Sequence, residues 1–181
     1  SVNNLIKFLD YECIISNNPD EIEQSSHIIL PGVGAFGAAM QKVKEKIPIN
    51  KLEKEIFDKK KPFLGICVGM QLMAETSEEF GEHKGLGWIE GRVKKIKSKI
   101  LPHIGWNDLI IKKESKILKG LNEHKDFYFV NSFHFDLKDK SLVLAETEYE
   151  EKFCSVLQKD NIFGVQFHPE KSQKTGQILL R

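Results

Sequence analysis

The pentapeptide Gly65-Ile66-Cys67-Val68-Gly69 is the segment whose residue types and spacing point most directly to chemistry. It lies between an apolar stretch and a segment of helical composition, so it has the form of a nucleophile elbow with cysteine in the nucleophile position. A helix expected over residues 68–79 would direct its amino end at the sulfur and favour the reactive thiolate. We interpret Cys67 as a nucleophile. The alternative is a small buried apolar residue, as free cysteines often are, and that interpretation is preferred for Cys13 and Cys154.

A second unit, Phe167-His168-Pro169-Glu170, supplies the groups that a cysteine nucleophile needs. Acyl transfer requires an imidazole that protonates the leaving amine and a third group that orients the imidazole. His168 follows an expected buried strand, Pro169 stiffens the turn, and the Glu170 carboxylate can reach back to the ring. The sequence therefore predicts a catalytic set of Cys67, His168 and Glu170. No comparable neighbourhood surrounds the other histidines, which are His27, His83, His103, His124 and His134.

A glycine-rich loop over residues 31–37 follows another apolar stretch. A tetrahedral intermediate needs backbone N–H donors aimed at its oxyanion, and glycines let a loop approach closely. We expect one donor from the amide of Val68 and one from the amide of Val33 or Gly34. Taken alone, the loop would be an ordinary turn before a helix. Its spacing fits neither a dinucleotide-binding motif nor a P-loop.

The elements that must position these groups change character along the chain. Short apolar segments alternate with helical ones through residue 79, which predicts parallel βαβ units. From Gly87 to Phe167 successive strand-like segments predict added antiparallel strands. We expect one α/β domain over residues 1–181, with a mixed, mainly parallel central sheet flanked by helices. The expected helices are 2–9, 38–46, 52–57 and 68–79, and the expected strands are 13–15, 27–30, 62–66, 88–96, 109–111, 127–133, 142–148, 153–157 and 162–167.

The amino-acid composition indicates which classes of binding partner and which cellular location are expected. The 27 basic and 26 acidic residues give a net charge of +1, which disfavours nucleic acid and anionic membranes as partners. Three cysteines without a repeating spacing predict neither a disulfide framework nor a metal site, and they favour a reducing, cytoplasmic location. No stretch is long enough to predict a membrane span. The lysine-rich stretches at 59–61 and 94–99 are interpreted as a solvated helix end and strand face.

With these motifs in place, the chain resembles the class I, triad-type glutamine amidotransferases. The resemblance rests on Gly65 to Gln71 followed by Phe167 to Glu170, in that order. It implies a flavodoxin-like fold, no cofactor, and hydrolysis of L-glutamine to glutamate and ammonia through a γ-glutamyl thioester on Cys67. His168 would move protons and Glu170 would orient His168. Further segments resemble the glutaminase subunits of imidazole glycerol phosphate synthase over essentially the whole chain, namely 31–37, 102–107, 128–132 and 168–172.

The same resemblance implies roles for residues outside the catalytic set. Gln71 and Glu79, on the helix after the nucleophile, and the backbone near Ser132 would hold glutamine. Ammonia would pass to a separate (β/α)₈ cyclase subunit in a heterodimer. Tyr128, Lys171 and Ser172 would lie near the subunit interface and transmit the ligand state of the partner to the oxyanion loop.

Two features of the sequence depart from the family pattern. Family members usually begin with a strand and a Gly-Asn turn, and this sequence starts at the following helix and stops within another, so we expect the natural protein to be longer at both ends. Asn131 stands where the family more often has histidine. This is compatible with a paralogue that feeds ammonia to another synthase, such as one that aminates a surface sugar. The sequence is also compatible with a catalytically silent binding module and with a stand-alone cysteine hydrolase.

Overall fold

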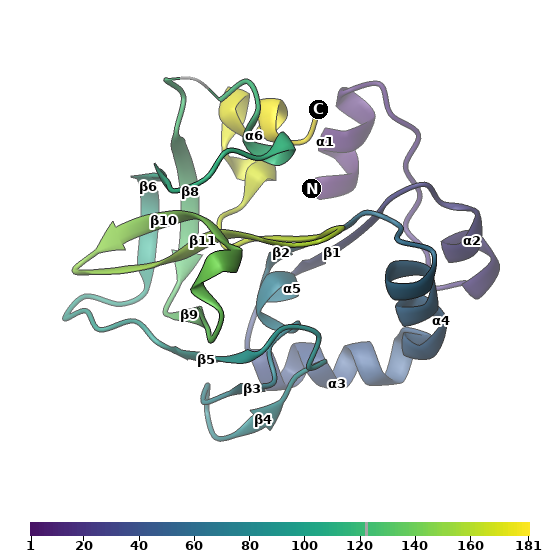
Figure 1. The fold of residues 1–181 in the computed structure, drawn as a ribbon, viewed down its shortest axis with the longest axis horizontal. Coiled ribbons are helices and arrows are strands. Elements are labelled where there is room, and N and C mark those ends of the chain that lie inside the picture. The colour runs from purple at the N-terminus through teal and green to yellow at the C-terminus, as the bar shows by residue number, and fades with distance from the viewer. Residues whose placement is uncertain (122) are drawn as a thin grey trace.

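A six-stranded sheet forms the centre of the molecule in the computed structural model, which describes residues 1–121 and 123–181 (Figure 1). Its strand order is β1 (Ile28–Gly32), β2 (Phe63–Cys67), β12 (Ile162–Val165), β11 (Glu151–Lys159), β10 (Val143–Tyr149) and β7 (Ile110–Ile111). The pairs β1–β2 and β2–β12 are parallel, and the remaining three pairs are antiparallel. The α/β fold with a mixed sheet is therefore confirmed. The expectation that this sheet is mainly parallel is wrong, because its parallel pairing is confined to β1, β2 and β12.

Helices lie on both sides of the parallel strands. Figure 1 shows α1 (Val2–Phe8) and α6 (Gln173–Leu179) on one side, and α3 (Phe36–Lys46) with α5 (Val68–Gln71) on the other. The helix α3 buries one face through Phe36, Met40 and Val43, as its apolar spacing predicts. The remaining helical elements are α2 (Pro19–Gln24), α4 (Ile49–Glu53), the π-helical η1 (Lys54–Asp58), and the 3₁₀ turns η2 (Lys116–Leu118), η3 (Lys140–Leu142) and η4 (Pro169–Lys171).

Two smaller sheets extend the molecule beyond the parallel strands. One has four strands in the order β4 (His83–Lys84), β3 (Thr76–Ser77), β5 (Gly91–Lys95) and β9 (Phe133–Leu137). The other pairs β6 (His103–Asp108) with β8 (Asp126–Asn131) in antiparallel register. The antiparallel pairs β5–β9 and β6–β8 confirm the additions expected after Gly87, whereas β3 and β4 precede Gly87 and were not expected.

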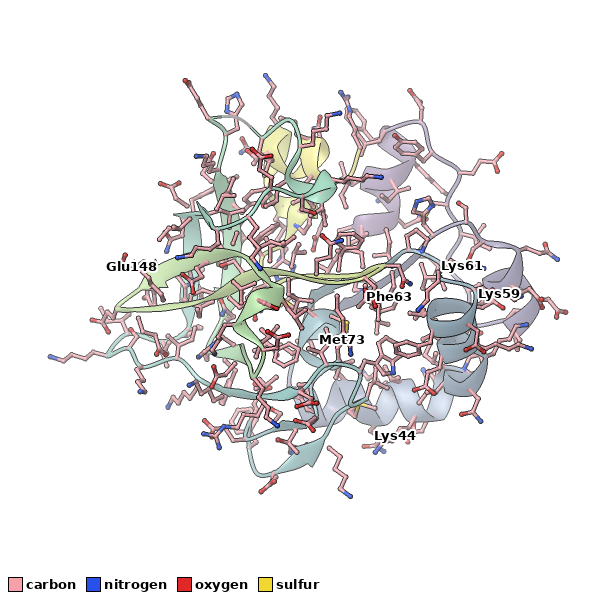
Figure 2. All side chains as sticks on the ribbon, viewed as in Figure 1. Lys44, Lys59, Lys61, Phe63, Met73 and Glu148 are labelled. Carbon is pink, nitrogen blue, oxygen red and sulfur yellow. The ribbon has the colours of Figure 1, made fainter. Side chains whose placement is uncertain are left out.

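Aromatic side chains fix the end of β12 against the neighbouring sheet. The rings of Phe127 and Phe167 stack with their centroids 3.9 Å apart, and both side chains are fully buried. Phe129 contacts Phe167 and Phe153 edge-on at 5.7 and 5.9 Å. Figure 2 shows how side chains such as Phe63 and Met73 fill the space around the central sheet. Because Phe167 is held on both sides, the residue after it has a fixed position.

Two predicted elements are wrong. Residues 13–15 form no strand, and Ile15 is 86% exposed, because no described segment pairs with their backbone. The helix expected over 68–79 ends at Gln71. Beyond that point the carbonyls of Leu72, Met73 and Ala74 accept hydrogen bonds from residues 86, 89 and 87 instead of from the next helical turn. A long-range pairing therefore replaces the local helical preference.

The lysine-rich stretch at 59–61 differs from the solvated helix end expected from the sequence. Glu55 is fully buried, and its carboxylate lies 3.5 Å from Lys51, 2.8 Å from Lys59 and 2.9 Å from Lys61. The side chain of Lys61 is only 10% exposed, and its ammonium also donates to the carbonyl of Ile22 (labels Lys59 and Lys61 in Figure 2). We call Glu55 and its three lysines the Glu55 cluster. Within the described ranges no helix has the length and apolar character needed to cross a bilayer.

Candidate active site

Cys67 lies at the sharp turn between β2 and α5. Its backbone has φ +54° and ψ −113°, a conformation that side-chain-bearing residues adopt only under strain. The flanking glycines make the turn possible: a Cβ on Gly69 would lie 1.8 Å from the carbonyl oxygen of Leu30, and one on Gly65 would lie 2.7 Å from the carbonyl oxygen of Gly69. The structure thus has the strained strand-to-helix elbow that the pentapeptide predicts.

His168 reaches Cys67 because β12 runs parallel to β2. Val165 is in register with Ile66, so the residues that follow both strands meet at the same edge of the sheet. The backbone N–H of His168 donates to the carbonyl of Tyr128 at 2.9 Å, which fixes the histidine on β8. Its ring hydrogen-bonds through Nδ1 to Glu170 Oε1 at 2.9 Å, and it lies close enough to Cys67 for that residue to raise the pKa of the imidazole. The structure therefore brings together all three residues of the predicted catalytic set.

Mutual interactions set the charge of this cluster. Burial alone would lower the pKa of His168, but its interactions with Cys67 and Glu170 raise it to about 9. Burial would raise the pKa of Glu170, but the hydrogen bond from His168 and the nearby positive charges lower it below its ordinary value. The imidazolium is thus stabilised beside the sulfur, which is the arrangement that supports a thiolate nucleophile.

The contribution of α5 to this charge is smaller than the sequence predicts. A helix of four residues carries little dipole, since the effect comes from several aligned peptide units. The imidazolium of His168 therefore replaces the helix as the main source of positive charge near Cys67.

The predicted oxyanion loop begins next to the nucleophile. Gly32 is in register with Cys67 across the β1–β2 pair, and Val33 and Gly34 follow immediately. The side chain of Val33 is 76% exposed and Gly34 has φ +87°, so this loop lies at the surface beside the elbow. Donation to an oxyanion by the amides of Val68 and of Val33 or Gly34 stays a prediction.

The three residues predicted to bind glutamine lie in different environments, and each already makes a hydrogen bond within the protein. Gln71 is buried, and its side-chain N–H groups donate to the carbonyl of Phe133 and to Gln166 Oε1, both at 3.0 Å. Glu79 follows β3 rather than standing on a helix, and its carboxylate accepts from the backbone N–H of Phe36 at 2.7 Å. The carbonyl of Ser132 accepts from Ile96. Their contact with glutamine stays a prediction.

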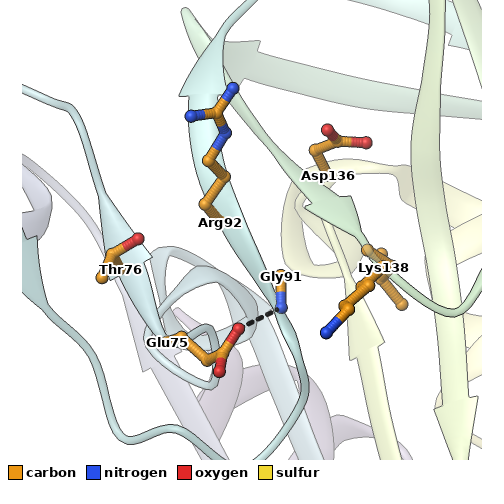
Figure 3. A pocket seen from close by; sticks show the side chains of 7 residues that line it. Glu75, Thr76, Gly91, Arg92, Asp136 and Lys138 are labelled. Atoms are coloured by element: carbon orange, nitrogen blue, oxygen red, sulfur yellow. Dashed lines mark hydrogen bonds between the residues drawn. The ribbon is translucent and has the colours of Figure 1, made fainter.

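A groove of about 430 Å³ lies beside the predicted oxyanion loop and gives Glu79 a setting in which it could meet a ligand. A second groove, of about 440 Å³, lies on the four-stranded sheet and is shown in Figure 3. None of the residues that line either groove belongs to the predicted catalytic set. The first groove is lined by Ala35, Gly37, Ala38, Gln41, Glu79, Phe80 and His83, and the second by Glu75, Thr76, Gly91, Arg92, Asp136, Leu137 and Lys138.

Of the predicted interface residues, two lie at the surface of the protein and one lies in its interior. Tyr128 is half-buried on β8, Lys171 is exposed with its ammonium 6.0 Å from the centre of the Tyr128 ring, and Trp106 on β6 lies beside Tyr128 and is 46% exposed. Ser172, in contrast, is fully buried. Its hydroxyl accepts from the N–H of Tyr128 at 3.0 Å and donates to the carbonyl of His168 at 2.6 Å. Ser172 therefore links β8 to the catalytic histidine from inside.

Two residues of this region were missed by sequence reasoning. Trp106 lies on an exposed strand face, and its place in the resembling segment 102–107 was the signal available. Gln166 is fully buried, with Nε2 at 3.8 Å from Cys67 Sγ. Its position two residues before His168 was the only signal in the sequence. Asn131, the departure from the family pattern, is buried and donates to the carbonyl of Phe133 at 3.0 Å.

Comparisons with known proteins agree with this geometry. The family model of class-I glutamine amidotransferases matches residues 2–180. The imidazole glycerol phosphate synthase subunit HisH of Pyrococcus furiosus is 49% identical over 92% of this chain and 85% of its own length. The subunit HisH 2 of Vibrio vulnificus is 45% identical over 100% of this chain and 86% of its own length.

Solved structures agree on the fold. A crystal structure of a glutamine amidotransferase matches with a TM-score of 0.73 at 18% identity, over 97% of this chain and 87% of that one. A glutamine amidotransferase of Thermotoga maritima matches with a TM-score of 0.61 at 20% identity, over 96% of this chain and 71% of that one. The family model covers nearly the whole chain and the sequence relatives exceed 40% identity, so this protein belongs to the class-I glutamine amidotransferase family.

Proposed function

We propose that this chain is the glutaminase subunit of an imidazole glycerol phosphate synthase, and that it acts in the cytoplasm. It hydrolyses L-glutamine to glutamate and passes the ammonia to a separate (β/α)₈ cyclase subunit. The observation that carries the proposal is the convergence of Cys67, His168 and Glu170 at one edge of the central sheet. Relatives described as HisH, at 45–49% identity over nearly the full chain, support this choice of synthase.

The proposed reaction uses each member of the triad in turn. The Cys67 thiolate attacks the side-chain carboxamide carbon of glutamine, and the amides of Val68 and of Val33 or Gly34 stabilise the oxyanion. The imidazolium of His168 then gives its proton to the leaving nitrogen, so ammonia departs and a γ-glutamyl thioester remains. Neutral His168 next takes a proton from water, and the hydroxide releases glutamate and regenerates the thiolate. Glu170 holds the ring in the orientation that both transfers need.

Substrate recognition is proposed to involve the groove beside the oxyanion loop. Glu79 is an acidic group suited to the α-ammonium of glutamine, and it lies in that groove next to Ala35 and Gly37. Both side-chain N–H groups of Gln71 are already used within the protein, so Gln71 supports the site through its contacts more than through its free donors. The carbonyl of Ser132 is likewise engaged with Ile96.

The partner is proposed to dock where the surface connects to the catalytic histidine. Trp106 and Ile104 are exposed on β6, next to Tyr128 and Lys171. Large aromatic side chains at a surface are typical anchors of protein interfaces. The backbone of Tyr128 bonds to both His168 and Ser172, so a partner that shifts β8 also shifts the imidazole.

Ammonia release from glutamine, measured with and without an added cyclase subunit, tests the proposal. We expect Cys67→Ala to abolish release in both conditions and Cys13→Ala to leave it near the wild-type rate, because Cys13 lies outside the site. The cyclase should accelerate the wild-type chain. Equal losses in the two variants would refute the nucleophile. Full turnover without a second protein would favour a stand-alone hydrolase, and no turnover under either condition would favour a silent binding module.

A second candidate is a paralogous glutaminase that serves a different synthase. Asn131 favours it, because this buried residue departs from the histidine that is more common in the family and packs beside the site. Co-purification of the natural complex distinguishes the two functions. An imidazole glycerol phosphate cyclase in the complex supports the first candidate, and a synthase that aminates another acceptor supports the second.

A further inference from the structure

Gln166 occupies a position that connects the catalytic histidine and the nucleophile. It follows β12 and precedes Phe167 and His168, and its side chain is fully buried. Its backbone N–H donates to the carbonyl of Ser155 at 2.9 Å, which ties this turn to β11. Its side-chain Nε2 lies 3.8 Å from Cys67 Sγ, within hydrogen-bond reach of a sulfur acceptor. The triad mechanism gives this buried amide no role.

The orientation of the Gln166 amide is set by a chain of contacts that starts at a backbone carbonyl. The carbonyl oxygen of Phe133 can only accept, so the side chain of Gln71 must present its NH₂ group to it at 3.0 Å. The second N–H of the same group lies 3.0 Å from Gln166 and needs an acceptor there, which places Oε1 of Gln166 toward Gln71. The NH₂ group of Gln166 is therefore turned toward Cys67.

We propose that Gln166 is a positioning residue that donates a hydrogen bond to the Cys67 thiolate, with Gln71 fixing the direction of its amide. This rests on the proposed role of Cys67 as the nucleophile. The bond adds a neutral donor to the sulfur, separate from His168, so it stabilises the charged form and holds Sγ in place. Burial strengthens the bond, because no water competes for either partner.

A hydrogen-bond donor to a thiolate has two opposite effects on its reactivity. Together they predict alkylation rates whose pH profiles cross when the donor is removed. Stabilising the anion lowers the pH at which the thiolate forms, and it also lowers the intrinsic nucleophilicity of the sulfur with a Brønsted coefficient of about 0.4–0.5. One hydrogen bond to a charged group shifts the midpoint by about one pH unit. Its removal should therefore slow alkylation about threefold below the midpoint and speed it about threefold above. A loss of packing alone would slow the reaction at every pH.

The test is the pH profile of Cys67 alkylation by iodoacetamide, followed by mass spectrometry of the peptide that contains Cys67. The reaction forms a sulfur–carbon bond as iodide leaves, so its rate reports the thiolate. We expect Gln166→Leu to move the midpoint up by about one pH unit, with profiles that cross. Gln158→Leu is the matched control on β11, where the amide donates to the carbonyl of Asp160 at 3.0 Å, and it should leave the midpoint unchanged.

A second variant tests the hydrogen bonds that orient the Gln166 amide without altering Gln166 itself. In Gln71→Leu no side-chain donor fixes the Gln166 amide, so its NH₂ group is no longer directed at the sulfur. We expect an upward shift no larger than that of Gln166→Leu, and Gln71→Leu with Gln166→Leu should shift no further than Gln166→Leu alone, because both changes act on one bond. This variant also keeps the proposal testable if Gln166→Leu fails to fold.

The outcomes separate this proposal from the proposed function. An unchanged midpoint in Gln166→Leu and in Gln71→Leu, while alkylation of Cys67 still abolishes glutaminase activity, would overturn the role of Gln166 alone. Parallel slowing at all pH values would also overturn it, since that is the signature of lost packing. Alkylation of Cys67 that leaves glutaminase activity intact would instead overturn the nucleophile assignment.

Discussion

Two buried carboxylates in this molecule are neutralised in different ways. Glu55 is surrounded by three lysines, and hydrogen bonds from Lys59 and Lys61 lower its pKa to about 2 against the effect of burial. Glu170 has one partner, the ring of His168. Lysine stays charged throughout the physiological pH range, whereas histidine can gain and lose a proton within it. The lysines therefore suit the Glu55 cluster to a structural role, whereas the histidine suits the Glu170 site to proton transfer.

The comparison predicts that removal of the histidine affects chemistry and leaves the fold intact. His168→Asn should lower glutaminase turnover by on the order of a thousandfold or more, because the triad acts as a unit. Its melting temperature, measured above pH 9 where the stabilising charge of His168 is lost, should stay close to that of the wild type. Ammonia release and thermal unfolding, measured on the same preparation, check this. A melting temperature that falls together with activity would remove the distinction between the two clusters.

The opposite pattern is expected for the Glu55 cluster. Glu55→Gln removes the anion beside Lys61, whose side chain is too buried to be fully hydrated, while Lys51 and Lys59 keep an ion pair with Glu23. The melting temperature should fall by several degrees, while kcat/KM measured well below the transition stays near the wild-type value. Lys138→Ala, which removes an exposed pair with Glu90, is the control and should change the melting temperature little. Loss of activity in Glu55→Gln at low temperature would contradict this.

Loss of the connection between β8 and His168 should affect both activity and stability, each to a moderate extent. Ser172→Ala removes the hydroxyl that bridges the N–H of Tyr128 and the carbonyl of His168. Leaving these buried groups unpaired should cost about 1–3 kcal/mol of stability. The looser imidazole should lower kcat about tenfold, with a smaller change in KM. Urea unfolding and steady-state kinetics measure the two quantities, and an unchanged kcat would mean that Ser172 serves the fold alone.

The smallest predicted effect is a difference in pH dependence. The pKa of His168 is raised in the folded state, so its contribution to stability is fully present below its unfolded pKa near 6.5 and is lost as pH rises through about 9. The pKa of Glu55 is lowered, so its contribution is present above about 4.5 and is lost as pH falls toward 2. Free energies of unfolding from pH 6 to 10 should therefore converge between wild type and His168→Gln. A gap that stays constant across this range would contradict the assigned charge state.

The parts of the fold that follow from local sequence were predictable, and those that need distant contacts were not. The elbow at Cys67 and the His168–Glu170 pair lie within a few residues of their partners in sequence, so spacing alone indicates them. The early end of α5 depends on carbonyls that bond to residues 86–89, and no local pattern signals that pairing. The pairs of the Glu55 cluster are local, since Lys51 and Lys59 each lie four residues from Glu55, but the spacing does not show that Glu55 is fully buried.

Gln166 shows the same limit inside the site. A glutamine in a strand-like segment has no special signature, and its role follows only from side chains 95 and 99 residues away in sequence. The chemistry of a triad can thus be predicted from motifs, whereas the groups that orient it require the structure.

The central claim is that Cys67 is the one sulfur that reacts with a glutamine-like electrophile. The direct measurement is labelling of the chain with 6-diazo-5-oxo-L-norleucine, with and without the cyclase subunit, followed by peptide mass spectrometry and an activity assay. We predict one label per chain, on Cys67, with activity lost in proportion, and no label on Cys13 or Cys154. Labelling of another cysteine, or full loss of activity with Cys67 unmodified, would contradict the account.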